Sequence, residues 1–140
     1  MSQLKLEIFT LCDYASISQD QKLSIIGIFD QFFVANLPAN WSRMFLVAVL
    51  KGDPGQKKTL TLKLTPPEAS TQEFPQKDFE VTLGNNGRAN LITELVNFPL
   101  QATGIHKFEI LSDNTVLGIL EFNVNKTTAT YQSPDKKVVN

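Results

Sequence analysis

The sequence has little of the material from which catalytic and metal sites are built. Its 140 residues include one cysteine, one histidine and one tryptophan. A single cysteine cannot form an internal disulfide, so nothing points to an oxidising compartment. A zinc site would need two carboxylates beside the one histidine and one cysteine, and no ligand spacing suggests such a set. We therefore predict no catalytic residue, no metal and no cofactor, and we expect that the protein is not an enzyme.

An excess of charge of one sign is also missing. The 13 Lys and Arg residues oppose 14 Asp and Glu residues, which gives a formal net charge of -1. Proteins that bind nucleic acid normally carry a clustered basic excess, and the basic residues here are scattered. We therefore expect no nucleic-acid partner.

Long apolar runs are equally missing. No stretch approaches the ~18 apolar residues that a membrane-spanning helix needs. The first residues lack the basic start, continuous apolar segment and small-residue cleavage site of a secretion signal. These observations predict a cytoplasmic protein with no membrane partner.

Helical periodicity is nearly absent, and short alternating runs of Ile, Val, Phe and Thr take its place. Gly, Pro, Asn and Asp separate these runs, as in residues 52–55 and 84–87. Eight strands are predicted, at about residues 3–12, 22–35, 43–51, 57–65, 78–83, 88–97, 105–112 and 115–124. This pattern predicts an all-β fold, an antiparallel two-sheet β-sandwich of Ig-like, Greek-key type.

The alternation of strands continues to about residue 126 without an internal linker. We therefore predict a single sandwich domain over residues 1–126. The alternation is lost after Lys126, so residues 127–140 are expected to form a loosely ordered C-terminal tail.

Two of the predicted strands, 22–35 and 43–51, are apolar on both faces. The outer face of a two-layer sandwich is normally polar, so we expect something to cover it. The candidates are a second copy of the chain, another protein, or the chain's own loop at 66–77. The predicted interaction surface consists of four apolar side chains: Ile26, Ile28, Met44 and Leu46.

Three single residues invite a chemical interpretation. Cys12 precedes Asp13, which opposes thiolate formation, so a structural role for the cysteine in the first strand is favoured over a nucleophile. His106 shares a face with Phe108 and Ile110, which favours a packed side chain over a base or metal ligand. Trp41 is interpreted as a plug at one end of the sandwich, with a binding platform as the alternative.

Several short motifs resemble an uncharacterised bacterial family of small β-sandwich proteins, a domain of unknown function. They are LCDYA at 11–15, KLSIIGIFD at 22–30, Pro38, GRANL at 87–91 and GIHKFEI at 104–110. The similarity spans roughly residues 6–124 and implies a bacterial cytosolic β-sandwich. It brings no catalytic residue.

The sequence departs from the pattern of this family in two places. Asp20-Gln21 stands where the family often has Gly or Asn-Gly, and His106 stands where it often has Tyr. Neither departure bears on the expected fold. Within the signature, Gly27 is expected to allow a close backbone approach or a bulge, and Asp30 to end the apolar stretch or bond across the sheet.

The function is not determined by these patterns. The leading hypothesis is a non-enzymatic β-sandwich that acts through a protein–protein surface, with a homodimer as the favoured assembly. The alternative is a small-ligand or carbohydrate-binding module with its site near Trp41 and the loop at 66–77.

Overall fold

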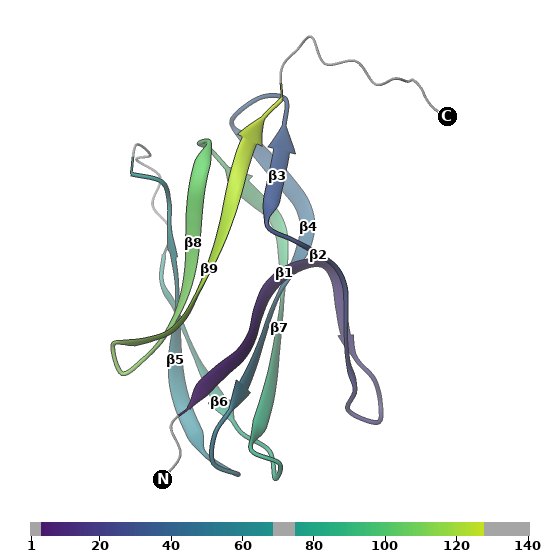
Figure 1. Ribbon diagram of the computed structural model, residues 1–140, viewed down its shortest axis with the longest axis vertical. Helices are drawn as coiled ribbons and strands as arrows, with labels where there is room; N and C mark the ends of the chain where they lie inside the picture. Colours follow the sequence, from purple (N-terminus) through teal and green to yellow (C-terminus); the bar gives the residue numbers. More distant parts are fainter. Residues whose placement is uncertain (1–3, 69–74, 128–140) are drawn as a thin grey trace.

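The computed structural model describes residues 4–68 and 75–127 and shows an all-β sandwich (Figure 1). This confirms the predicted fold class. The strands are β1 (Lys5–Ile17), β2 (Leu23–Phe29), β3 (Gln31–Val34), β4 (Ala39–Lys51), β5 (Lys57–Thr65), β6 (Lys77–Thr82), β7 (Arg88–Leu100), β8 (Gly104–Ser112) and β9 (Thr115–Lys126).

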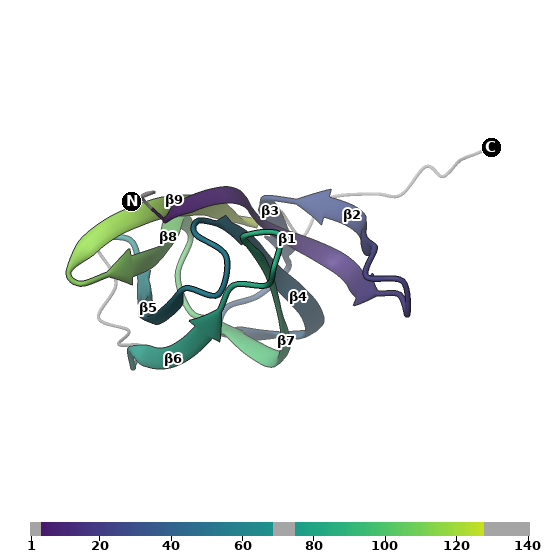
Figure 2. The same ribbon diagram turned by 90° about the horizontal axis from the view of Figure 1, so that it is seen from below.

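The strands form two sheets. A four-stranded sheet has the order β2-β1-β4-β7, and a five-stranded sheet has the order β3-β9-β8-β5-β6. Neighbouring strands are antiparallel except β3 and β9, which run parallel. Seen from below, the hairpin of β1 and β2 projects away from the five-stranded sheet (Figure 2). The described residues contain no helix that could cross a membrane.

The predicted strand at 22–35 is in fact two strands in different sheets. The chain leaves the four-stranded sheet after Phe29, and β3 joins the other sheet beside β9. At the crossing the Asp30 carbonyl accepts a hydrogen bond of 2.8 Å from the Asn123 amide. Phe29 and Phe32, on either side of the crossing, meet edge to face at 5.3 Å in the core. Asp30 thus ends the first apolar stretch, as the sequence predicted.

The core between the sheets has two parts. One part surrounds Phe32, Met44 and Phe122. The other surrounds Leu50, Leu60 and Leu83. Ring contacts are frequent in the first part.

Residues 44–50 of β4, which lies between β1 and β7, are buried on both faces because side chains pack against each face. The even-numbered side chains of β4, such as Met44 and Leu46, join the core between the sheets. Its odd-numbered side chains Phe45 and Val47 form a small outer cluster with Cys12 and Ala15. Leu23, Ile25 and Ile92 pack against this outer cluster.

The chain therefore covers much of the outer face itself, with the β1–β2 hairpin. The loop at 66–77, which the sequence offered as the internal cover, is described only at residues 66–68 and 75–77. Of the predicted tail at 127–140, the structure describes Thr127, whose amide donates a 2.8 Å hydrogen bond to the Val34 carbonyl.

Candidate functional site

The β1–β2 hairpin carries the most exposed part of the predicted surface. Ile26 and Ile28 on β2 keep 59% and 65% of their side-chain area exposed. Tyr14 on β1 lies directly opposite Ile26, so the two side chains share one face of the hairpin. Tyr14 is also exposed. These three side chains form an apolar surface that the described part of the chain leaves exposed.

Met44 and Leu46 do not belong to this surface. Their exposures are 0% and 4%, and both lie in the core between the sheets. The strand pairing gives the physical reason. Cys12 pairs with Ile28 on one side and with Phe45 on the other, so the odd-numbered side chains of β4 face outward beside the hairpin. Neighbouring residues of a strand point to opposite faces. The prediction therefore chose the even-numbered, inward side chains of β4, whereas the outward ones are odd-numbered.

Phe45 joins the hairpin to the rest of the four-stranded sheet. The Tyr14 ring meets it edge to face at 5.4 Å between centroids. The Arg43 guanidinium lies 5.2 Å from the centroid of the same ring, a cation–π distance. Arg43 forms an ion pair with Glu94, and it pairs in register with Val96, which is 60% exposed.

We call Tyr14, Ile26, Ile28 and Val96, together with the Arg43–Glu94 ion pair, the hairpin surface. Sequence reasoning found its two isoleucines and missed the rest. Tyr14 could have been found, because the predicted turn at 19–21 places it opposite Ile26. Val96 could not have been found in the sequence, because its position depends on the pairing of β4 with β7, which are far apart in the sequence.

Gly27 fixes the shape of the hairpin between the two isoleucines. Its φ is +72°, a conformation that side chains other than glycine rarely adopt. A Cβ at this position would lie 2.5 Å from Oδ2 of Asp13. The sequence predicted a close backbone approach or a bulge at Gly27, and the structure shows that the group next to it is the Asp13 side chain.

Cys12 lies at the base of the hairpin and is fully buried. Its thiol donates to the Phe45 carbonyl at 3.8 Å and to the Tyr14 carbonyl at 3.4 Å. Burial raises the pKa of the Cys12 thiol, and the neighbouring Asp13 carboxylate raises it further. Both effects oppose formation of the nucleophilic thiolate.

Trp41 and His106 are packed side chains. The Trp41 ring lies 4.8 Å from Phe32 and 6.3 Å from Phe29, among the aromatic rings at one end of the core. The His106 ring stacks on Phe122 at 4.8 Å inside the sandwich. In residues 4–68 and 75–127, no three His, Cys, Asp or Glu side chains gather in a way that could hold a metal ion.

Comparison with known proteins places the chain in a family. The model of DUF6941, a family of unknown function, matches residues 7–125. The chain belongs to this family. This agrees with the resemblance found in the sequence motifs, which span nearly the same residues. No curated protein matches the chain in sequence.

Solved structures share the fold at low identity. The alkylpurine DNA glycosylase AlkC of Pseudomonas fluorescens, bound to DNA containing an abasic site analog, is 14% identical with a TM-score of 0.54, and the match covers 89% of this chain and 31% of that protein. The GH3 beta-glucosidase of Bifidobacterium adolescentis is 11% identical with a TM-score of 0.52, and the match covers 89% of this chain and 17% of that protein. The beta-glucosidase of Listeria innocua in complex with glucose is 12% identical with a TM-score of 0.51, and the match covers 91% of this chain and 16% of that protein.

The chain therefore spans less than a third of the length of each of these proteins. At these identities the likeness concerns the fold alone.

Proposed function

We propose that this DUF6941 protein is a non-enzymatic binding protein of the bacterial cytoplasm, and that it acts through the hairpin surface by pairing with a second copy of itself. The observation that carries the proposal is the group of exposed apolar side chains around Phe45, namely Tyr14, Ile26, Ile28 and Val96. Exposed apolar side chains gathered on one face, with charged groups at their edge, are typical of a protein interface, whose core is apolar and whose rim is polar.

The edge strand of the hairpin supports a second copy as the partner. β2 has β1 on one side, and its other edge ends the four-stranded sheet. The seven residues Leu23–Phe29 include no charged side chain and no proline. Edge strands of monomeric proteins are usually protected by charges, prolines or bulges. In a two-fold dimer each copy would present this same uncharged edge and its isoleucines to the other.

The states of Cys12 and His106 support a non-enzymatic role. Burial raises the pKa of the Cys12 thiol and lowers the pKa of the His106 imidazole. Both side chains are buried and lie in different sheets, so neither can activate the other as a nucleophile and base.

The test is the double variant Ile26→Asp, Ile28→Asp, studied by sedimentation velocity. Both side chains are exposed, so the variant should fold, which its thermal melt will show. The wild type should change from monomer to dimer between ~1 and ~100 μM, and the double variant should weaken the dimer at least about 100-fold.

The matched control is Ile119→Asp. Ile119 is an isoleucine of β9 with 52% exposure, in the other sheet. The Ile119→Asp variant should dimerise like the wild type. A wild type that stays monomeric at ~100 μM, or equal loss of the dimer in the control, contradicts the proposal.

The small-ligand alternative is not favoured at Trp41, one of the two places where the sequence suggested it. The Trp41 ring packs against Phe29 and Phe32, so it offers little free ring face for stacking on a sugar. A ligand site is supported elsewhere in the fold, at the open side of the sandwich.

A further inference from the structure

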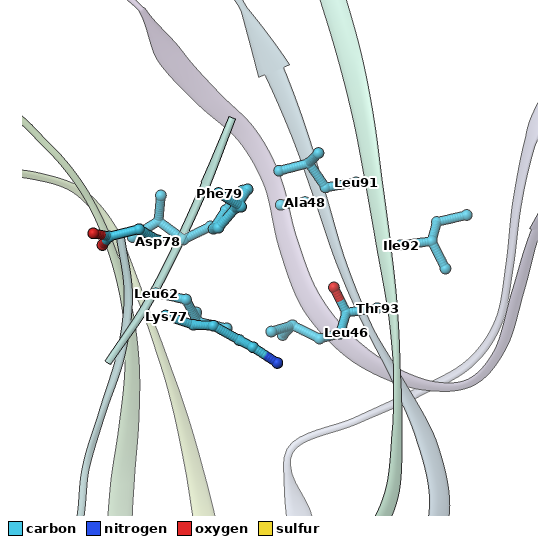
Figure 3. Close-up of a pocket in the computed structure, with 10 residues that line it drawn as sticks. Leu46, Ala48, Leu62, Lys77, Asp78, Phe79, Leu91, Ile92 and Thr93 are labelled. Carbon is cyan, nitrogen blue, oxygen red and sulfur yellow. The ribbon is translucent and has the colours of Figure 1, made fainter. Parts of the chain in front are cut away.

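Within residues 4–68 and 75–127, no strand closes the sandwich on the side opposite the β1–β2 hairpin. There β6 ends one sheet and β7 ends the other, and the two edge strands do not pair. A cavity of about 300 Å³ enters the core between them (Figure 3). Its walls come from both sheets and are mostly apolar: Leu46, Ala48, Leu62, Phe79, Leu91 and Ile110. Lys77, Asp78 and Thr93 add polar groups to the lining.

The cavity lies where the two parts of the core meet. Leu46 belongs to the part around Phe32 and Phe122, whereas Ala48 and Ile110 belong to the part around Leu50. Ala48 is the small residue among these neighbours on β4, and its short side chain leaves room that Leu or Met would fill. An apolar space of this kind gains free energy by taking up an apolar group.

One cation is directed toward this apolar space. Lys77 pairs with Leu62 across β5 and β6, so its side chain lies on the core-facing side of the sheet. Figure 3 shows the Lys77 side chain extending toward Leu46 and Thr93 with its nitrogen between the sheets. Among the described residues no acidic group forms an ion pair with Lys77.

The neighbouring carboxylate is directed to the other side. Asp78 pairs with Thr61 and accepts a 2.8 Å hydrogen bond from its hydroxyl on the outer face of the sheet. Lys77 and Asp78 both line the cavity, and of these two charged groups Lys77 is the one whose side chain lies on the core-facing side of the sheet. Its positive charge selects a negative group on a ligand.

We infer that this cavity binds a small amphiphile with one anionic head and a flexible apolar body, of the class of medium-chain carboxylates. The apolar body lies against Ala48, Leu91 and Ile110, and the head pairs with the Lys77 ammonium at the mouth. The volume is about twice the ~150 Å³ of an apolar cavity that holds benzene, which corresponds to about a dozen carbon atoms. It also lies at the lower end of the range of ligand sites, ~300–1,000 Å³.

The experiment is a calorimetric titration of the full chain with hexanoate, octanoate, decanoate and dodecanoate below their micelle concentrations. Each added methylene should tighten binding about fourfold until the cavity is full. In methyl NMR spectra, decanoate should shift the signals of Ala48, Leu91 and Ile110. It should leave those of Ile26 and Ile28 on the hairpin surface in place.

The charge is tested with Lys77→Met, whose side chain is at the surface and is not needed for folding. This variant should bind decanoate about fivefold more weakly than the wild type and bind decanol equally well. The control is Lys63→Met, an exposed lysine on the neighbouring strand β5, which should bind decanoate like the wild type.

A second variant, Ala48→Leu, fills the cavity and should abolish saturable binding while the β-sheet circular dichroism spectrum is retained. The inference is overturned if no member of the series binds saturably at millimolar concentration. In that case the inward lysine serves only to keep the edge strand β6 from pairing with other chains. It is also overturned if Lys77→Met binds decanoate as well as the wild type, or if the shifted methyl signals lie outside the cavity.

Discussion

His106 makes two close contacts inside the sandwich. Its ring lies flat on Phe122, and Nδ1 lies 3.2 Å from the Gly104 carbonyl, to which it donates in the neutral form. Burial lowers the pKa of the imidazole below its ordinary value of 6.5, and the Gly104 carbonyl offsets part of this effect. The nearby charges Lys107 and Glu121 lie on the outer face, where they pair with each other.

This burial makes the stability of the sandwich depend on pH. Because the folded state holds the His106 proton less tightly than the unfolded state, unfolding takes up a proton in mildly acidic solution. The free energy of unfolding should therefore fall as the pH drops below about 6.5, and continue to fall until the folded pKa is passed. Urea unfolding at a series of pH values measures this.

The control is His106→Phe, which keeps a ring against Phe122 and removes the titrating group. The difference in stability between wild type and variant should be constant above neutral pH and should shift in favour of the variant in acid. A difference that does not change with pH would show that His106 binds protons equally well in the folded and unfolded states.

At the scale of elements, the crossing from β2 to β3 depends on one side chain. Phe32 is fully buried, and its ring meets those of Phe29, Trp41 and Phe122 within 5.3 Å. It anchors a four-residue strand that has β9 as its partner on one side. The next residue, Phe33, has 61% of its area exposed.

These neighbours form a matched pair of variants. Phe32→Ala should lower the free energy of unfolding by about 3–5 kcal/mol, because it removes a buried ring and leaves a cavity. Phe33→Ala should change it by no more than ~0.5 kcal/mol. Urea unfolding curves of both variants check this, and an equal loss in the two would mean that β3 does not pack as described.

The same elements show what the sequence could reveal. The alternation in 57–65 and the turn at 19–21 are local patterns, so the strands and the hairpin could be predicted from them. The division of residues 22–35 between two sheets could not be predicted from the sequence. Phe29 and Phe32 are equally apolar, and only the strands with which they pair differ. Alternation shows which side chains share a face and leaves open which face is the inner one.

At the scale of the whole molecule, two places with incompletely covered apolar groups carry the proposals. One is the hairpin surface around Phe45, and the other is the cavity between β6 and β7. The sequence pointed toward the first, since Ile26 and Ile28 belong to a strand that is apolar on both faces. It gave no sign of the cavity, because the cavity requires two unpaired edges to lie across from each other.

The central claim, that the chain pairs with itself through the hairpin, is tested most directly by hydrogen–deuterium exchange at two concentrations. At ~100 μM, peptides covering 12–17 and 23–29 should exchange more slowly than at ~1 μM, because dimerisation shields the free edge of β2 and the side chains beside it. Peptides covering β5 and β8, in the middle of the other sheet, should exchange equally at both concentrations. Identical exchange of the hairpin at the two concentrations, or protection confined to other strands, would contradict the account.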